Sequence, residues 1–141
     1  MTERLVRKFQ AGLRPLLPPD EHLVDVAKAL PMSGPTSLGD GAVRQAGASI
    51  ARSFPRPRLR GSSLLIVTNR RLCFAVLSPS RQGAQLLWDM PREAVRGVEP
   101  QRRFRGLPRF RLHFSDGSWV SLLTLWSGTV DALVGVLGDA R

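Results

Sequence analysis

From residue 62 onward, apolar residues come in short runs that are separated by turn-forming residues. The clearest pair, residues 64–68 and 72–77, lies in the segment LLIVTNRRLCFAVL and flanks Asn69 and Arg70. Short apolar runs bounded by turn residues are typical of β-strands, and Asn accepts the positive φ angle that tight hairpin turns favour. We therefore predict a β-hairpin here. Its tip carries adjacent arginines, Arg70 and Arg71, and their role is the first question that the sequence raises.

Further strands are predicted after this hairpin, at residues 85–88, 94–99, 109–114 and 119–125. The last two flank Asp116-Gly117, and Asp-Gly between alternating strands is the strongest short hairpin signal. Strands that follow one another through short turns predict antiparallel sheets.

A helix is predicted at the end of the chain. Ser127 is a candidate N-cap, Asp131 is expected in the first turn, and Gly138 is expected to end the helix. Apolar residues recur between them at helical spacing, at Val130, Leu133, Val134 and Leu137.

The first part of the chain is less regular. Residues 3–14 predict an amphipathic helix that ends near Pro15, within an N-terminal segment 1–17. Such a basic helix can lie on a membrane, but packing on its own domain is favoured. Residues 22–30 fit a strand or a short helix, and we prefer the strand.

A long insertion is predicted at residues 31–61, which are rich in Pro, Gly, Ser and Arg. Within it, Val43, Ala46, Ile50 and Phe54 fall on one helical stripe, which predicts a short helix over about residues 41–53. Long insertions in compact domains are often functional.

The order of these elements resembles the bacterial PH-like domains of the YokE and GRAM type. The resemblance covers residues 62–138 and rests on the Thr-Asn-Arg-Arg and Phe-Ser-Asp-Gly hairpins placed before a terminal helix. It implies an α+β fold in which two orthogonal antiparallel sheets, or a β-barrel, are capped by the C-terminal helix. We expect residues 1–141 to form one such domain. The resemblance also implies a scaffold that binds lipids, peptides or other domains and performs no catalysis.

Positive charge is concentrated in the middle of the chain. The formal net charge is +10, and residues 52–111 alone hold 14 Arg against Asp89, Glu93 and Glu99, which gives 14 − 3 = +11. A surplus of this size attracts anions, and the guanidinium fork suits phosphate and carboxylate groups. A genome that favours Arg codons is an equally good explanation of the surplus.

Two groups of basic residues are candidates for anion binding. In lipid-binding PH domains, the loop between the opening strands and the strand after it supply basic residues, one position apart, to the phosphate site. Arg56-Pro57-Arg58-Leu59-Arg60 resembles this arrangement. On an extended segment these three guanidinium groups share one face, and the turn with Arg81 is expected at the same end of the barrel. A second basic patch is expected at the other end of the barrel, formed by Arg70, Arg71, Arg102, Arg103, Phe104 and Arg105. Arg71 could instead support the barrel, for example by pairing with Glu99.

Catalysis, metal binding and cofactor binding are poorly supported. His22 and His113 stand apart from any ligand cluster, and Cys73 lies in an apolar strand where a buried, unreactive thiol is expected. The sequence contains no GxSxG, P-loop or GxGxxG motif. No apolar run approaches the ~20 residues that cross a bilayer. We expect a cytoplasmic protein without a cofactor, which could associate peripherally with the membrane.

The leading hypothesis is a non-enzymatic PH-like binding module. It would dock on an anionic membrane surface or an acidic protein partner through Arg56, Arg58, Arg60 and Arg81, with the second patch auxiliary. One alternative is a nucleic-acid-binding protein that uses residues 52–111. Another is a self-assembling PH-like protein whose strand edges pair in a homo-oligomer.

Overall fold

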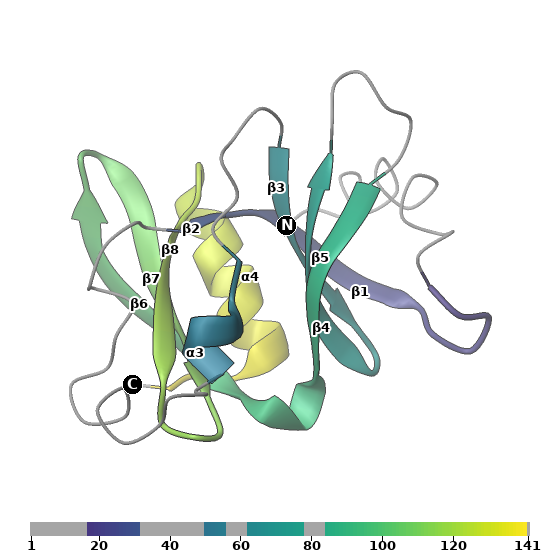
Figure 1. Ribbon diagram of the computed structural model, residues 1–141. Helices are drawn as coiled ribbons and strands as arrows, with labels where there is room; N and C mark the ends of the chain where they lie inside the picture. Colours follow the sequence, from purple (N-terminus) through teal and green to yellow (C-terminus); the bar gives the residue numbers. More distant parts are fainter. Residues whose placement is uncertain (1–16, 32–49, 56–61, 78–83, 141) are drawn as a thin grey trace.

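The computed structural model describes residues 17–31, 50–55, 62–77 and 84–140 (Figure 1). These residues form two four-stranded antiparallel sheets, with strand orders β1-β3-β4-β5 and β2-β8-β7-β6. The first sheet contains β1 (Leu23–Lys28), β3 (Ser62–Thr68), β4 (Arg71–Leu77) and β5 (Ala84–Pro91). The second contains β2 (Leu30–Pro31), β6 (Val95–Phe104), β7 (Leu107–Phe114) and β8 (Trp119–Leu123). The helices are α3 (Ile50–Ser53), the 3₁₀ turn η3 (Arg92–Ala94) and α4 (Ser127–Leu137). The predicted antiparallel sheets and terminal helix are confirmed.

The main core lies between the two sheets. Strand β7 shows why, because Phe110, Leu112 and Phe114 are fully buried while the residues between them face outward. Val130 and Leu133 of α4 join the same cluster, so this helix closes one side of the core (Figure 1). Burying each of these large side chains stabilises the fold by about 1.5–3 kcal/mol.

The first sheet is apolar on both faces. Phe74 in β4 belongs to the main core, whereas Cys73 and Ala75 belong to a second buried cluster with Val26 and Ile66. Because both faces of β4 are buried, its sequence is a continuous apolar run without alternation.

The short helix α3 inserts a side chain between the sheets. The ring of Phe54, just after α3, lies 5.0 Å from Phe74 and 4.8 Å from Trp88 between ring centroids. The Ile50 N–H donates to Asp116 Oδ2 at 2.8 Å, which ties the helix to the β7–β8 turn. The predicted helix over residues 41–53 is thus confirmed at residues 50–53, and its earlier part lies outside the described residues.

Several boundaries differ from the sequence predictions. Strands β5 and β6 are longer than the strands predicted at residues 85–88 and 94–99, and β6 continues to Phe104. Helix α4 has Trp126 at its N-cap, so Ser127 is its first helical residue and Asp131 lies beyond its first turn. The helix ends at Gly138, as predicted, and the φ angle of this glycine is 100°. The predicted N-terminal helix over residues 3–14 lies outside the described residues.

Candidate functional site

The first predicted anion site cannot be placed on the fold. Arg56, Arg58, Arg60 and Arg81 lie outside the described residues, so their grouping stays a prediction. The six residues of the second predicted patch are all described, and the structure divides them into two groups.

Asn69 and Arg70 form the turn between β3 and β4 without positive φ angles. Among the described non-glycine residues only Arg105 has a positive φ, so the conformation expected for Asn69 is wrong. The hydroxyl of Thr68 shapes the turn instead, because its Oγ1 accepts the N–H groups of Arg70 at 3.1 Å and Arg71 at 2.8 Å. Asn69 Oδ1 accepts the His22 N–H at 2.8 Å, which joins the turn to the segment before β1.

Arg71 is an internal ion-pair partner. Its Nε donates to both carboxylate oxygens of Glu21, at 3.1 and 2.8 Å, and its Nη1 donates to Asp89 Oδ2 at 2.7 Å. Thr68 Oγ1 also donates to Glu21 Oε2 at 2.8 Å, so the Glu21 carboxylate accepts hydrogen bonds from both Arg71 and Thr68. The bonds to Glu21 raise the pKa of Arg71 above its already high value. Arg71 is therefore paired within the fold, but the suggested pairing with Glu99 is wrong, because its partners are Glu21 and Asp89.

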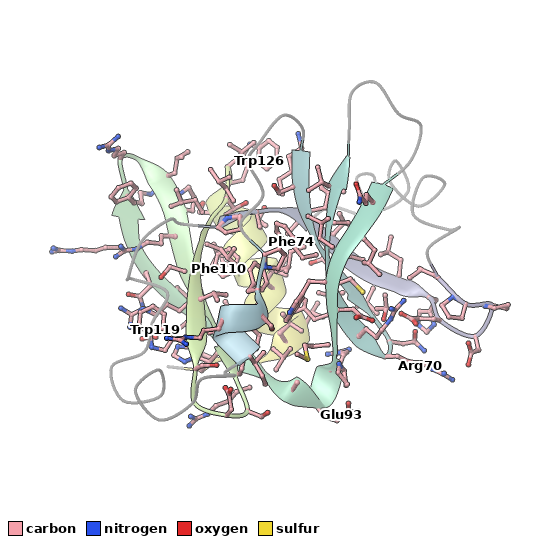
Figure 2. All side chains as sticks on the ribbon, viewed as in Figure 1. Arg70, Phe74, Glu93, Phe110, Trp119 and Trp126 are labelled. Carbon is pink, nitrogen blue, oxygen red and sulfur yellow. The ribbon has the colours of Figure 1, made fainter. Side chains whose placement is uncertain are left out.

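Arg70 is paired as well, at the surface. Its Nη2 lies 2.5 Å from Asp20 Oδ2, and both side chains are more than half exposed. Arg70 lies at the lower right of Figure 2, whereas the β6–β7 turn lies at the upper left in Figure 1. The structure therefore does not bring Arg70 and Arg71 together with Arg102–Arg105 as one patch.

The second group forms the tip of the β6–β7 hairpin. Arg105 and Gly106 connect the strands with φ angles of 51° and 82°, as in the type I′ turns that two-residue hairpins favour. A Cβ at Gly106 would meet no atom within 4 Å, so the backbone conformation is what favours glycine there. The sequence predicted a longer connection here, between the strands at residues 94–99 and 109–114, and the glycine in RRFRGLPRFRL is the signal of the tighter turn.

This tip exposes an aromatic ring among basic side chains. Phe104 is 38% exposed, and Arg105 Cζ lies 5.4 Å from the centre of its ring. Arg102 is exposed, and Arg103 Nη1 donates to the carbonyl of Gly106 at 2.8 Å. None of these three arginines forms an ion pair with the described residues. We call residues 102–106 the basic tip.

The outward face of β7 continues the positive charge below the tip. Arg111 lies over the ring of Trp119 at 4.0 Å and has Nη1 4.0 Å from Glu99 Oε1. The same carboxylate oxygen lies 2.8 Å from His113 Nε2, which gives this histidine a partner within the sheet. Among the described residues no group of three metal-ligating side chains occurs.

Cys73 is buried on β4, and burial raises the pKa of its thiol from an ordinary 9.0 to about 11. We expect it to resist alkylation at pH 8 in the folded protein, because the thiolate is the reactive form. Since the folded-state pKa is raised, its contribution to stability is full below pH 9 and is lost as the pH rises through about 11. Labelling with a thiol reagent, with and without denaturant, measures this. Equal labelling rates in both conditions would contradict the buried thiol.

Comparison with solved structures identifies proteins of similar fold. The hSac2 domain from the human phosphoinositide phosphatase Sac2 matches with a TM-score of 0.52 and 15% identity, over 97% of this chain and 81% of that domain. A pleckstrin homology domain from Shewanella amazonensis SB2B matches with a TM-score of 0.46 and 15% identity, over 96% of this chain and 93% of that domain. The fold is α+β, as predicted, and it is similar to that of the hSac2 domain. Two antiparallel sheets with α4 against their shared core are its architecture. No protein-family model and no curated protein matches the sequence.

Proposed function

We propose that this protein is a non-enzymatic PH-like binding module that docks on an anionic membrane surface through the basic tip. The observation that carries the proposal is Phe104, exposed between arginines that form no ion pair with the described residues. This distinguishes the tip from Arg70 and Arg71, whose charges are already matched by acidic side chains. The YokE/GRAM assignment and the site at Arg56, Arg58, Arg60 and Arg81 stay predictions beside it.

Charge supports an anionic partner for the hairpin. Residues 100–115 contain five arginines and no Asp or Glu, so an approaching anion meets no local repulsion. Arginine forms charge-assisted bonds with phosphate oxygens, and each basic residue near an anionic bilayer contributes about 1 kcal/mol. No described helix is long and apolar enough to span a membrane. The proposed attachment is peripheral.

Reversing two charges at the tip tests the proposal. The variant Arg102→Glu/Arg103→Glu is expected to bind phosphatidylserine vesicles roughly thirtyfold more weakly or worse at physiological salt, because about 2 kcal/mol of attraction is removed. Arg70→Glu/Arg96→Glu changes the net charge equally at exposed positions away from the tip and is the matched control. Co-sedimentation with vesicles, with excess short DNA as competitor, gives both dissociation constants.

Three results would contradict the proposal. Equal weakening by both variants would mean that net charge alone is responsible, and unchanged binding by both would place the site elsewhere. Loss of vesicle binding in the presence of DNA would favour the nucleic-acid alternative, which predicts a steep salt dependence.

A further inference from the structure

Exposed apolar side chains gather at one end of the second sheet. Leu125 is 51% exposed and Trp126 is 50% exposed, in the connection between β8 and α4. Large apolar side chains of a soluble domain rarely lie this open in adjacent positions without a partner. The described residues with large, exposed apolar side chains are Val24, Leu30, Leu87, Phe104, Leu125 and Trp126.

Hydrogen bonding places the end of β8, just before Leu125 and Trp126, at the same end of the sheet as the basic tip. The Thr124 N–H donates to the carbonyl of Pro108 at 3.0 Å, so the end of β8 lies against the start of β7. Leu107, next to Pro108, is the register partner of Phe104. Strand β7 therefore lies between the end of β8, which precedes Leu125, and the end of β6, which carries Phe104.

Strand β2 lies beside β8 on the side away from β7, at the same end of the second sheet. Leu30 is the register partner of Leu123, and it is more than one-third exposed. Trp126 lies at the top of Figure 2, the end at which the β6–β7 turn is seen in Figure 1. Leu30, Phe104, Leu125 and Trp126 thus lie at one end of the second sheet, on β2, on β6 and on the connection that follows β8, with β7 between β6 and β8. We call these four residues the apolar edge.

Charge and side-chain chemistry point to a lipid bilayer as the partner of this end. The basic tip and the apolar edge share Phe104, and residues 117–130 carry no charged side chain at all. Trp is suited to the bilayer interface, where its ring is buried among acyl chains and its N–H reaches water. The aliphatic leucines offer nothing to a nucleic-acid base, and stable peripheral binding usually combines basic attraction with apolar insertion.

We infer that the apolar edge inserts into the interface of an anionic bilayer, with Trp126 and Leu125 as the deepest residues and the arginines of the basic tip among the lipid headgroups. This inference rests on the proposed membrane docking and adds a second, apolar component to it. The bilayer then faces the end of the second sheet where β6 turns into β7. Binding through both components persists at physiological salt, because salt screens the charges and leaves apolar insertion intact.

The variant Leu125→Ser/Trp126→Ser tests the insertion. Both side chains are half exposed, and Ser at the N-cap of α4 is a favoured residue there, so the fold is expected to persist. Affinity for phosphatidylserine vesicles at physiological salt is expected to fall about tenfold or more, since apolar area no longer enters the interface. Leu87→Ser, which changes an exposed leucine of β5, is the matched control and is expected to bind normally.

A second measurement reports the position of Trp126 directly. Vesicles with brominated acyl chains are expected to quench part of the wild-type tryptophan fluorescence, and the serine variant is expected to lose that quenching. Trp88 is buried in the core, and Trp119 lies at the opposite end of β8 from Trp126 (Figure 2), so the lipid is expected to reach neither. Unchanged affinity of the serine variant, or equal quenching in both proteins, overturns the inference.

Failure of the insertion and failure of the docking are distinguishable. If Arg102→Glu/Arg103→Glu abolishes vesicle binding while Leu125→Ser/Trp126→Ser leaves it unchanged, the docking stands and the insertion is overturned. If the wild-type protein does not bind anionic vesicles, both are overturned. A wild-type dimer that the serine variant converts to a monomer, without any vesicle effect, would assign the edge to a second copy of the chain and overturn the inference.

Discussion

Replacement of Arg71 by alanine is expected to lower the free energy of unfolding by about 3 kcal/mol. Its guanidinium holds two carboxylates, and the side chain of Glu21 is only 3% exposed. Without Arg71, Glu21 is left as a buried charge that retains one hydrogen bond from Thr68. Urea unfolding followed by tryptophan fluorescence measures the loss.

Arg70→Ala is the matched control, one position earlier in the same turn. Arg70 and Asp20 are each 57% exposed, and such surface pairs contribute about 0–1 kcal/mol. The double variant Glu21→Gln/Arg71→Met removes both charges together and is expected to recover part of the loss, because no buried charge is left unmatched. An equal, small effect of Arg71→Ala and Arg70→Ala would refute the structural role of Arg71.

The position of this turn could be predicted from the sequence, but the role of its arginines could not. The turn is encoded locally, by Asn69 and Arg70 between two apolar runs. The partner of Arg71 is Glu21, which is 50 positions earlier, and only the pairing of β1 with β3 brings them together. Charge patterns along the chain cannot distinguish a matched arginine from an unmatched one, because the partner is a property of the tertiary structure.

The strands of the second sheet were predictable for a physical reason. In β7, Arg109, Arg111 and His113 alternate with buried aromatic and aliphatic residues, since one face of this sheet covers the core and the other faces outward. Strand ends were less predictable. Pairing with β7 extends β6 to Phe104, through polar residues that have no strand pattern of their own.

The apolar edge was missed because its residues belong to different elements. Leu125 was predicted as the end of a strand, and Trp126 carries no periodic signal beside the helix that follows. Exposure cannot be read from either residue type, since both are usually buried. Their proximity to Phe104 depends on the register of three strands, and only the fold supplies that register.

Replacement of Phe54 by alanine is expected to destabilise the fold by about 3–4 kcal/mol, the usual cost of deleting a buried aromatic ring. Phe54 is only 5% exposed and contacts the rings of Phe74 and Trp88, so its loss leaves a cavity between the sheets. The indole N–H of Trp88 donates to Ser53 Oγ at 3.0 Å, and loosening α3 is expected to shift its fluorescence as well.

The size of this loss decides what α3 does in the fold. Phe54→Leu keeps most of the apolar volume and is expected to cost about 1 kcal/mol, while Val24→Ala, at an exposed position of β1, is expected to cost less than about 0.5 kcal/mol. A graded series in denaturant unfolding, with the alanine at Phe54 costing most, means that α3 is part of the core. If Phe54→Ala costs no more than Val24→Ala, α3 is a surface turn, and the core is complete without the insertion that carries it.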